Sequence, residues 1–171
     1  EADAQLNPAS NAKVVTAAAA LALLGPEYYF ETALYGDLEA AAIEGPLVLR
    51  GRGDPTLTIE DLWGLAAELR RSGVRVVRGD VVVDATFFDD DTEPPAFDQQ
   101  PGERSYFRAP VGGVNVNRNV VTVSVRPAPS AGRPAIVTSE PEGALEVVND
   151  SVTVEGGPPA ITLVENPDLL A

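Results

Sequence analysis

The sequence contains no cysteine, no histidine and only one lysine, Lys13, among its 171 residues. Without cysteine there is no disulfide and no thiolate nucleophile. Without histidine a Ser-His-Asp triad is impossible within this chain, and a zinc site is disfavoured. A serine that attacks an acyl group here needs another base. Arginine stays protonated and cannot act as one, so Lys13 is the candidate.

Positive charge of any kind is scarce, because 12 basic residues face 26 acidic ones and the net charge is −14. Such an acidic surface argues against nucleic acids and anionic membranes as partners. Four arginines lie close together between residues 70 and 78, but acidic residues surround them. The chain is 44% apolar, which is enough for one sizeable domain or for a large domain plus a fragment.

The N-terminal segment predicts a helix over Pro8 to Leu24. Asn7 is suited to cap it, Pro8 fits the first helical position, and Gly25 with the following proline ends it. The interior is apolar on nearly all sides, which is typical of a helix buried inside a domain. No later segment of the chain is an obvious complete cover for it.

A lysine followed by the apolar run Val14 to Leu24 is also a pattern found in signal peptides. We reject that interpretation, because Glu1 and Asp3 precede the lysine and no small-residue cleavage site follows before Tyr28. The run is too short to cross a bilayer, so we expect no transmembrane segment in this chain.

A second helix is predicted over Ile59 to Ser72, between a Thr58–Asp61 capping box and Gly73. Its expected apolar face consists of Ile59, Leu62, Trp63, Ala66 and Leu69, with Trp63 in the core.

The rest of the chain predicts short strands, with a break at Gly45-Pro46 and a polar loop over 89–104. The expected strands are Tyr28–Tyr35, Leu47–Arg50, Val74–Val77, Val81–Asp84, Val114–Val125, Ala135–Thr138, Leu145–Val148, Val152–Val154 and Ile161–Val164. The fold class is therefore α+β: one unit from Tyr28 to about Glu165, attached to a separate N-terminal helix.

The spacing of Ser10 and Lys13 places both side chains on one face of the first helix, within hydrogen-bond reach. A Ser-x-x-Lys pair at the start of a helix can perform acyl transfer, with serine as nucleophile and lysine as general base. The positive potential of the helix N-terminus favours the neutral amine and stabilises a developing oxyanion, for which the Ser10 backbone N–H is one possible donor.

The pattern alone is weak, since it also describes a helix-start serine beside a solvated lysine. Three features favour the chemical interpretation: Pro8-Ala9 precedes the serine, Lys13 is the only lysine, and an unbroken apolar helix follows.

With these residues in view, the sequence resembles the D-alanyl-D-alanine carboxypeptidases of the low-molecular-mass class C penicillin-binding proteins. The similarity covers nearly the whole chain. It is carried by Pro8–Ala20, Leu24–Thr32, Leu49–Leu57, Gly79–Asp84 with Phe87, and Tyr106–Asn119.

The resemblance implies a serine transpeptidase/β-lactamase-like domain that is interrupted, soon after its Ser-x-x-Lys helix, by a large α+β insertion. Residues 1–26 would begin the catalytic domain, 27–165 would form the insertion, and 166–171 would return toward the catalytic half. The resemblance also implies a cell-envelope enzyme, periplasmic or extracytoplasmic, that removes the terminal D-Ala from peptidoglycan stem peptides. Ser10 would be the nucleophile, which β-lactams acylate, and Lys13 its general base. No metal and no organic cofactor would be involved.

The family completes its site with a Ser-x-Asn element and a Lys-Thr-Gly strand, and neither occurs in this chain. We therefore expect a fragment that has little activity alone. Two other hypotheses remain open: a non-catalytic module that binds cell-wall polymer or protein, and a β-lactamase-like serine esterase. The large insertion argues against the esterase.

Overall fold

The structure, a computed structural model, describes residues 7–93, 97, 103, 105–158 and 160–164. The chain divides into two compact units, Glu1–Glu31 (unit 1) and Thr32–Ala171 (unit 2). The predicted return segment, residues 166–171, lies outside the described residues. Helices and strands are both present, which confirms the α+β class.

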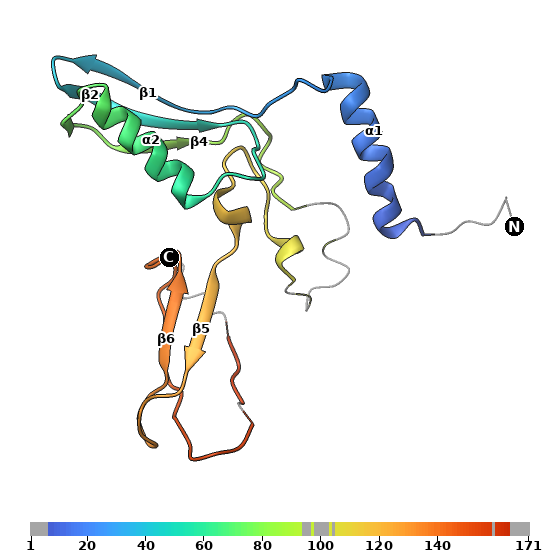
Figure 1. Cartoon of the computed structure of the whole chain (residues 1–171), viewed down its shortest axis with the longest axis vertical. Helices are drawn as coiled ribbons and strands as arrows, with labels where there is room; N and C mark the ends of the chain where they lie inside the picture. Colours follow the sequence, from blue (N-terminus) through green and yellow to red (C-terminus); the bar gives the residue numbers. More distant parts are fainter. Residues whose placement is uncertain (1–6, 94–96, 98–102, 104, 159, 165–171) are drawn as a thin grey trace, which may run out of the picture. The chain divides into compact units, whose positions relative to one another are not determined.

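Unit 1 consists of a 3₁₀ turn, η1 (Ala9–Asn11), that leads directly into α1 (Ala12–Leu24) (Figure 1). The predicted helix is therefore confirmed, although its first turn is 3₁₀ rather than α. Gly25 ends α1 with a φ of 82°, a conformation that costs glycine little. None of the residues of α1 is buried. Within the described residues, no helix combines the length and the apolar character needed to cross a membrane.

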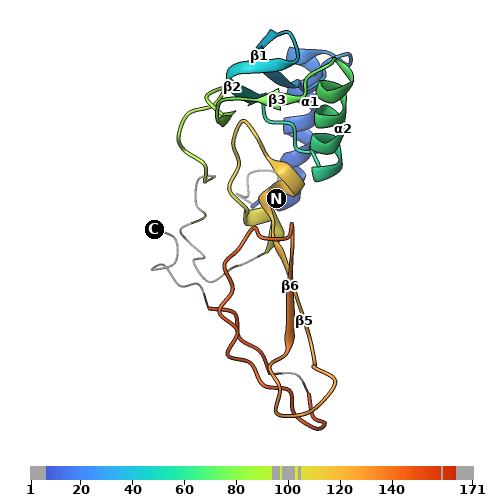
Figure 2. The same ribbon diagram turned by 90° about the vertical axis from the view of Figure 1, so that its left-hand side faces the viewer.

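Unit 2 contains a four-stranded sheet. β1 (Thr32–Glu39) pairs antiparallel with β2 (Ala42–Gly51), and β3 (Val76–Val77) and β4 (Val81–Asp84) both pair parallel to β2. The chain passes from β2 to β3 through α2 (Ile59–Arg71), which Figures 1 and 2 show alongside the sheet. The core of unit 2 comes mainly from β2 and from the residues just before and just after α2, and consists of Ala42, Ile43, Leu47, Leu49, Leu57 and Val74.

The predicted break at Gly45-Pro46 is wrong, because β2 continues through it. The β1–β2 ladder instead shifts register here, so that Gly36 alone faces the three residues Gly45, Pro46 and Leu47. Gly45 has a φ of 90°, proline lacks an N–H, and the N–H of Leu47 is donated to Asp80 O (2.9 Å). A bulge thus absorbs two residues that would otherwise end a strand.

The prediction of α2 is confirmed, including both hydrogen bonds of its Thr58–Asp61 capping box. Its apolar face is partly wrong: the Trp63 side chain is 73% exposed and is not in the core. Ala66, also predicted on this face, is exposed too. The half-buried positions of α2 are Ile59, Leu62, Leu65 and Leu69, and this 3–4 residue spacing leaves Trp63 at the edge of the stripe.

The predicted strand over Val114 to Val125 is wrong in its first half. A 3₁₀ turn, η4 (Val116–Asn119), precedes β5 (Thr122–Arg126), which pairs antiparallel with β6 (Ile136–Glu140). A further 3₁₀ turn, η3, spans Tyr106–Arg108. The three strands expected over Leu145–Val148, Val152–Val154 and Ile161–Val164 do not form: all of these residues are described, and none is in a strand.

Candidate active site

The two residues singled out by the sequence meet in unit 1. The Lys13 ammonium donates a hydrogen bond to Ser10 Oγ over 2.9 Å. Ser10 lies in η1 and Lys13 in the first turn of α1, so the helical backbone sets their separation. Both residues are exposed, and the described residues give neither side chain a second hydrogen-bonding partner.

The turn before the serine is held by two hydrogen bonds. Asn7 Oδ1 accepts the Ala9 N–H at 2.9 Å, and Pro8 O accepts the Asn11 N–H, also at 2.9 Å. Ala9 has a φ of 45°, in the left-handed region that a residue with a Cβ rarely adopts. The sequence gives no direct sign of this conformation, although an asparagine two residues earlier is typical of such side-chain-to-backbone turns.

The arrangement has the parts that acyl transfer without histidine requires. When the Lys13 amine is neutral, the hydrogen bond reverses: the Ser10 hydroxyl donates to the nitrogen, which is then placed to take the proton as Oγ attacks. The free backbone N–H groups of the helix start add positive potential around the same oxygen. Among the described residues, this serine and lysine form the whole of the candidate site.

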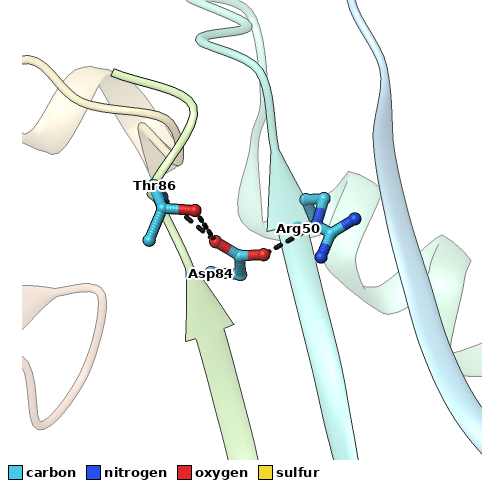
Figure 3. A network of polar contacts seen from close by, with 3 residues as sticks. All are labelled: Arg50, Asp84 and Thr86. Carbon is cyan, nitrogen blue, oxygen red and sulfur yellow. Dashed lines mark hydrogen bonds and ion pairs between the residues drawn. The ribbon is translucent and has the colours of Figure 1, made fainter. Parts of the chain in front are cut away.

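A second polar cluster ties β2 to β4 in unit 2 (Figure 3). Arg50 Nε donates to Asp84 Oδ2 at 2.6 Å, and the hydroxyl and backbone N–H of Thr86 donate to Asp84 Oδ1 at 2.7 and 3.1 Å. The bonds from Thr86 and Arg50 lower the pKa of Asp84 to about 2. The same contact with Asp84 raises the pKa of Arg50, whose guanidinium also lies 5.1 Å from the centre of the Tyr35 ring.

Unit 2 also contains an apolar pocket of about 390 Å³ that is not among the features expected from the sequence. The sequence feature that indicates this pocket is the set of aromatic residues on either side of the 89–104 loop. Its lining comes wholly from unit 2: Gly53, Pro55, Phe88, Tyr106, Phe107, Ala109, Pro110, Val111, Gly112, Asn115 and Arg118.

This α+β chain has a hydrogen-bonded serine and lysine at the N-terminus of a helix. These are features of serine acyl-transferases and hydrolases. Comparison with known proteins narrows this class. The chain belongs to the D-Ala-D-Ala carboxypeptidase 3 (S13) family, whose family model matches residues 1–166. The resemblance drawn from the sequence is thereby confirmed.

A D-alanyl-D-alanine carboxypeptidase of Actinomadura sp. (strain R39) is 40% identical to this chain over 179 residues. That alignment covers 95% of this chain and 32% of the relative. The chain thus spans about a third of the length of this curated relative.

Among solved structures, the chain is similar to penicillin binding protein 4 (dacB) from Haemophilus influenzae. The TM-score is 0.64 at 30% identity, over 77% of this chain and 29% of that one. A second structure of the same protein, complexed with a novel β-lactam, matches with a TM-score of 0.50 at 27% identity, over 73% of this chain and 24% of that one.

Proposed function

We propose that this chain forms part of a serine-type D-Ala-D-Ala carboxypeptidase that acts on peptidoglycan stem peptides, with Ser10 as nucleophile and Lys13 as general base. The observation that carries the proposal is the 2.9 Å hydrogen bond between the Lys13 amine and Ser10 Oγ at the start of α1. Membership of a carboxypeptidase family supports the substrate class.

The reaction begins with the neutral Lys13 amine accepting the hydroxyl proton while Ser10 Oγ bonds to the carbonyl carbon of the penultimate D-Ala. The tetrahedral intermediate collapses as the C–N bond breaks, and the Lys13 ammonium gives the proton it accepted to the departing nitrogen, which releases free D-Ala and leaves the amine neutral again. Water then attacks the serine ester. The products are the shortened peptide and the regenerated hydroxyl, and no cofactor or metal takes part. Cleavage of D-Ala cross-links as an endopeptidase uses the same steps.

The Ser10 backbone N–H is proposed as one oxyanion donor. It lies at the start of the helical segment, where N–H groups lack an intrahelical acceptor. The carbonyl oxygen of the substrate gains negative charge only after attack, so a donor fixed at this point stabilises the transition state more than the ground state.

β-Lactams are proposed as covalent inhibitors at the same serine. When Oγ opens the lactam ring, the amine that leaves the carbonyl stays tethered to the acyl group and remains in the site, which hinders the entry of water. The β-lactam complex of the Haemophilus influenzae protein supports this expectation.

We further propose that residues 1–26 belong to a transpeptidase-like catalytic domain and that residues 27–165 form an inserted α+β domain. The division of the chain into units at Glu31 and Thr32 supports a boundary in this region. The proposed location is the cell envelope, on the periplasmic or extracytoplasmic side, where the peptidoglycan substrate lies.

The test is labelling of the full-length gene product with a fluorescent penicillin, followed by mapping of the modified peptide. We expect the label on Ser10 and no label after Ser10→Ala. Thr16→Ala is the matched control, because it removes another hydroxyl from α1, one that donates only to Ala12 O at 3.2 Å. Equal labelling of the Ser10→Ala protein would contradict the role of Ser10. Absence of labelling in the wild type would contradict the enzyme proposal and favour a non-catalytic, cell-wall-binding module.

A further inference from the structure

Asn7 makes a contact that is distinct from ordinary capping of α1. Its Oδ1 accepts the N–H of Ala9, two residues ahead, and does not reach the first N–H groups of α1 itself. The bond closes a small ring around Pro8 and Ala9 and therefore fixes the backbone immediately before the serine.

Ala9 is held in an unfavourable conformation by this turn. Its φ of 45° brings Cβ close to the following carbonyl group, so an alanine left to itself returns to negative φ. Such a conformation persists only where the surroundings hold it, and outliers of this kind cluster at functional sites. In the described part of unit 1, the contacts that hold it are the Asn7 side chain and the Pro8 O to Asn11 N bond.

The dihedral angles of Ala9 set the direction in which the next residue leaves the turn. A rotation at Ala9 therefore moves both the Ser10 N–H and its Cβ–Oγ bond relative to α1, which carries Lys13. A hydrogen bond of 2.9 Å leaves little room for such a movement, since displacements of about 1 Å break it.

We propose that Asn7 is a positioning residue for the acylation of Ser10: its side-chain oxygen holds Ala9 left-handed and so aims Ser10 Oγ at the Lys13 amine. This inference rests on the proposed function, and it adds a residue outside the Ser-x-x-Lys pair.

The alternative is that Asn7 only stabilises the helix start, and the chain contains a control for that. Thr58 caps α2 through its bond from the Asp61 N–H, and α2 belongs to unit 2. Thr58→Ala removes a cap without touching the turn before Ser10. It should lower thermal stability while leaving the acylation rate within about twofold of the wild type.

The experiment measures the second-order rate constant for acylation of the full-length gene product by a fluorescent penicillin. Asn7→Ala should slow acylation by about tenfold, because displacements of about 1 Å in an active site cost up to about 100-fold. Asn7→Asp keeps an acceptor oxygen at the same position and should restore the rate to within about twofold of the wild type. Asn7→Gln keeps the amide but moves its oxygen by one methylene, so it should be as slow as Asn7→Ala. If Asn7→Ala does not fold, Asn7→Gln takes its place as the test variant.

Acylation at the wild-type rate in Asn7→Ala or Asn7→Gln would overturn the inference, as would failure of Asn7→Asp to recover. A Ser10→Ala sample in the same series separates the two proposals. If that protein is still labelled, the proposed function fails. If it is not labelled while Asn7→Ala reacts normally, only the role of Asn7 fails.

Discussion

Arg50 and Asp84 are register partners on the neighbouring parallel strands β2 and β4, and their side chains form an ion pair of 2.6 Å at the ends of both strands. Thr86 holds the second carboxylate oxygen from the residues that follow β4. Directly after the pair, Gly53 N donates to Gly113 O at 2.7 Å, which joins the end of β2 to a distant loop. The pair therefore fastens the sheet at the point where three segments of the chain converge.

The titration of Asp84 gives the first prediction. Its pKa is about 2 in the folded chain and about 3.9 in an unfolded one, so the unfolded state binds the proton more readily. The stability contributed by the carboxylate is therefore complete above about pH 4 and is lost as the pH falls from about 4 to about 2. Urea unfolding midpoints measured between pH 6 and 2.5 should fall less steeply for Asp84→Asn than for the wild type. The control Asp90→Asn removes an exposed carboxylate for which the described structure gives no partner, and its profile should follow the wild type.

The end of β2 has no room for a side chain at Gly51. A Cβ there would overlap the carbonyl group of Gly113 and lie 2.7 Å from a methyl group of Val114. Because the carbonyl is backbone, Gly51→Ala should destabilise unit 2 by about 2–3 kcal/mol, as overpacked sites do. In contrast, Gly64 lies inside α2 with open space around it, so Gly64→Ala should stabilise by about 0.5–1 kcal/mol. Circular dichroism during urea unfolding measures both changes, and changes of the same sign would contradict this description of the packing.

The capping box of α2 gives a third prediction. Thr58→Ala removes the acceptor of the Asp61 N–H and the hydroxyl that donates to the Asp61 carboxylate, and should cost about 1 kcal/mol. These contacts with Thr58 also lower the pKa of Asp61, so the cost should shrink as Asp61 is protonated at low pH. Thermal unfolding at pH 7 and pH 3 tests both statements. Glu60→Gln, in the same turn but outside the box, should have a much smaller effect at either pH.

Lys13 gives a fourth prediction. Lys13→Ala should abolish labelling by penicillin in the full-length gene product and leave the fold of unit 2 intact, because all the buried residues of the described chain belong to unit 2. Lys13→Arg retains a positive charge but supplies no base, so it should be inactive too. The circular dichroism spectrum and the thermal unfolding midpoint of the variant should match those of the wild type. Labelling of Lys13→Arg at the wild-type rate would mean that the charge, and not proton transfer, is what Ser10 requires.

The elements predicted correctly from the sequence have strong local signals. α2 has a capping box, leucines at helical spacing and a terminating Gly73, and each of these acts within a few residues. The proximity of Ser10 and Lys13 was predictable for the same reason, since one helical turn determines it. Their chemical roles stay predictions, because a nearby serine and lysine do not by themselves show proton transfer.

The errors lie where distant parts of the chain decide the local conformation. Val114 to Val125 alternates like a strand, yet Asn117 Oδ1 accepts the N–H of Ile59 at 3.2 Å and its own N–H is donated to Leu57 O at 2.9 Å. Asn117, Arg118 and Asn119 all take positive φ in that turn. Local propensity carries no information on a partner nearly sixty residues earlier, and the bulge at Gly45 likewise depends on the strand opposite.

The segment from Asn149 to Thr153 is hydrogen-bonded to the loop between β5 and β6. Two of these bonds are main-chain bonds of Thr153 with Gly132 and Arg133, and three others come from side chains of the segment. The Asn149 amide donates to Ala135 O at 2.8 Å, Ser151 Oγ accepts the Ala135 N–H at 3.3 Å, and Thr153 Oγ1 accepts the Ala128 N–H at 2.9 Å. Main-chain bonds tolerate almost any side chain, whereas the three side-chain bonds require particular polar groups at alternate positions. Substitutions at 149, 151 or 153 should therefore loosen this segment. If relatives keep the same residues at these positions, the reason lies in the docking of the segment and not in a catalytic role.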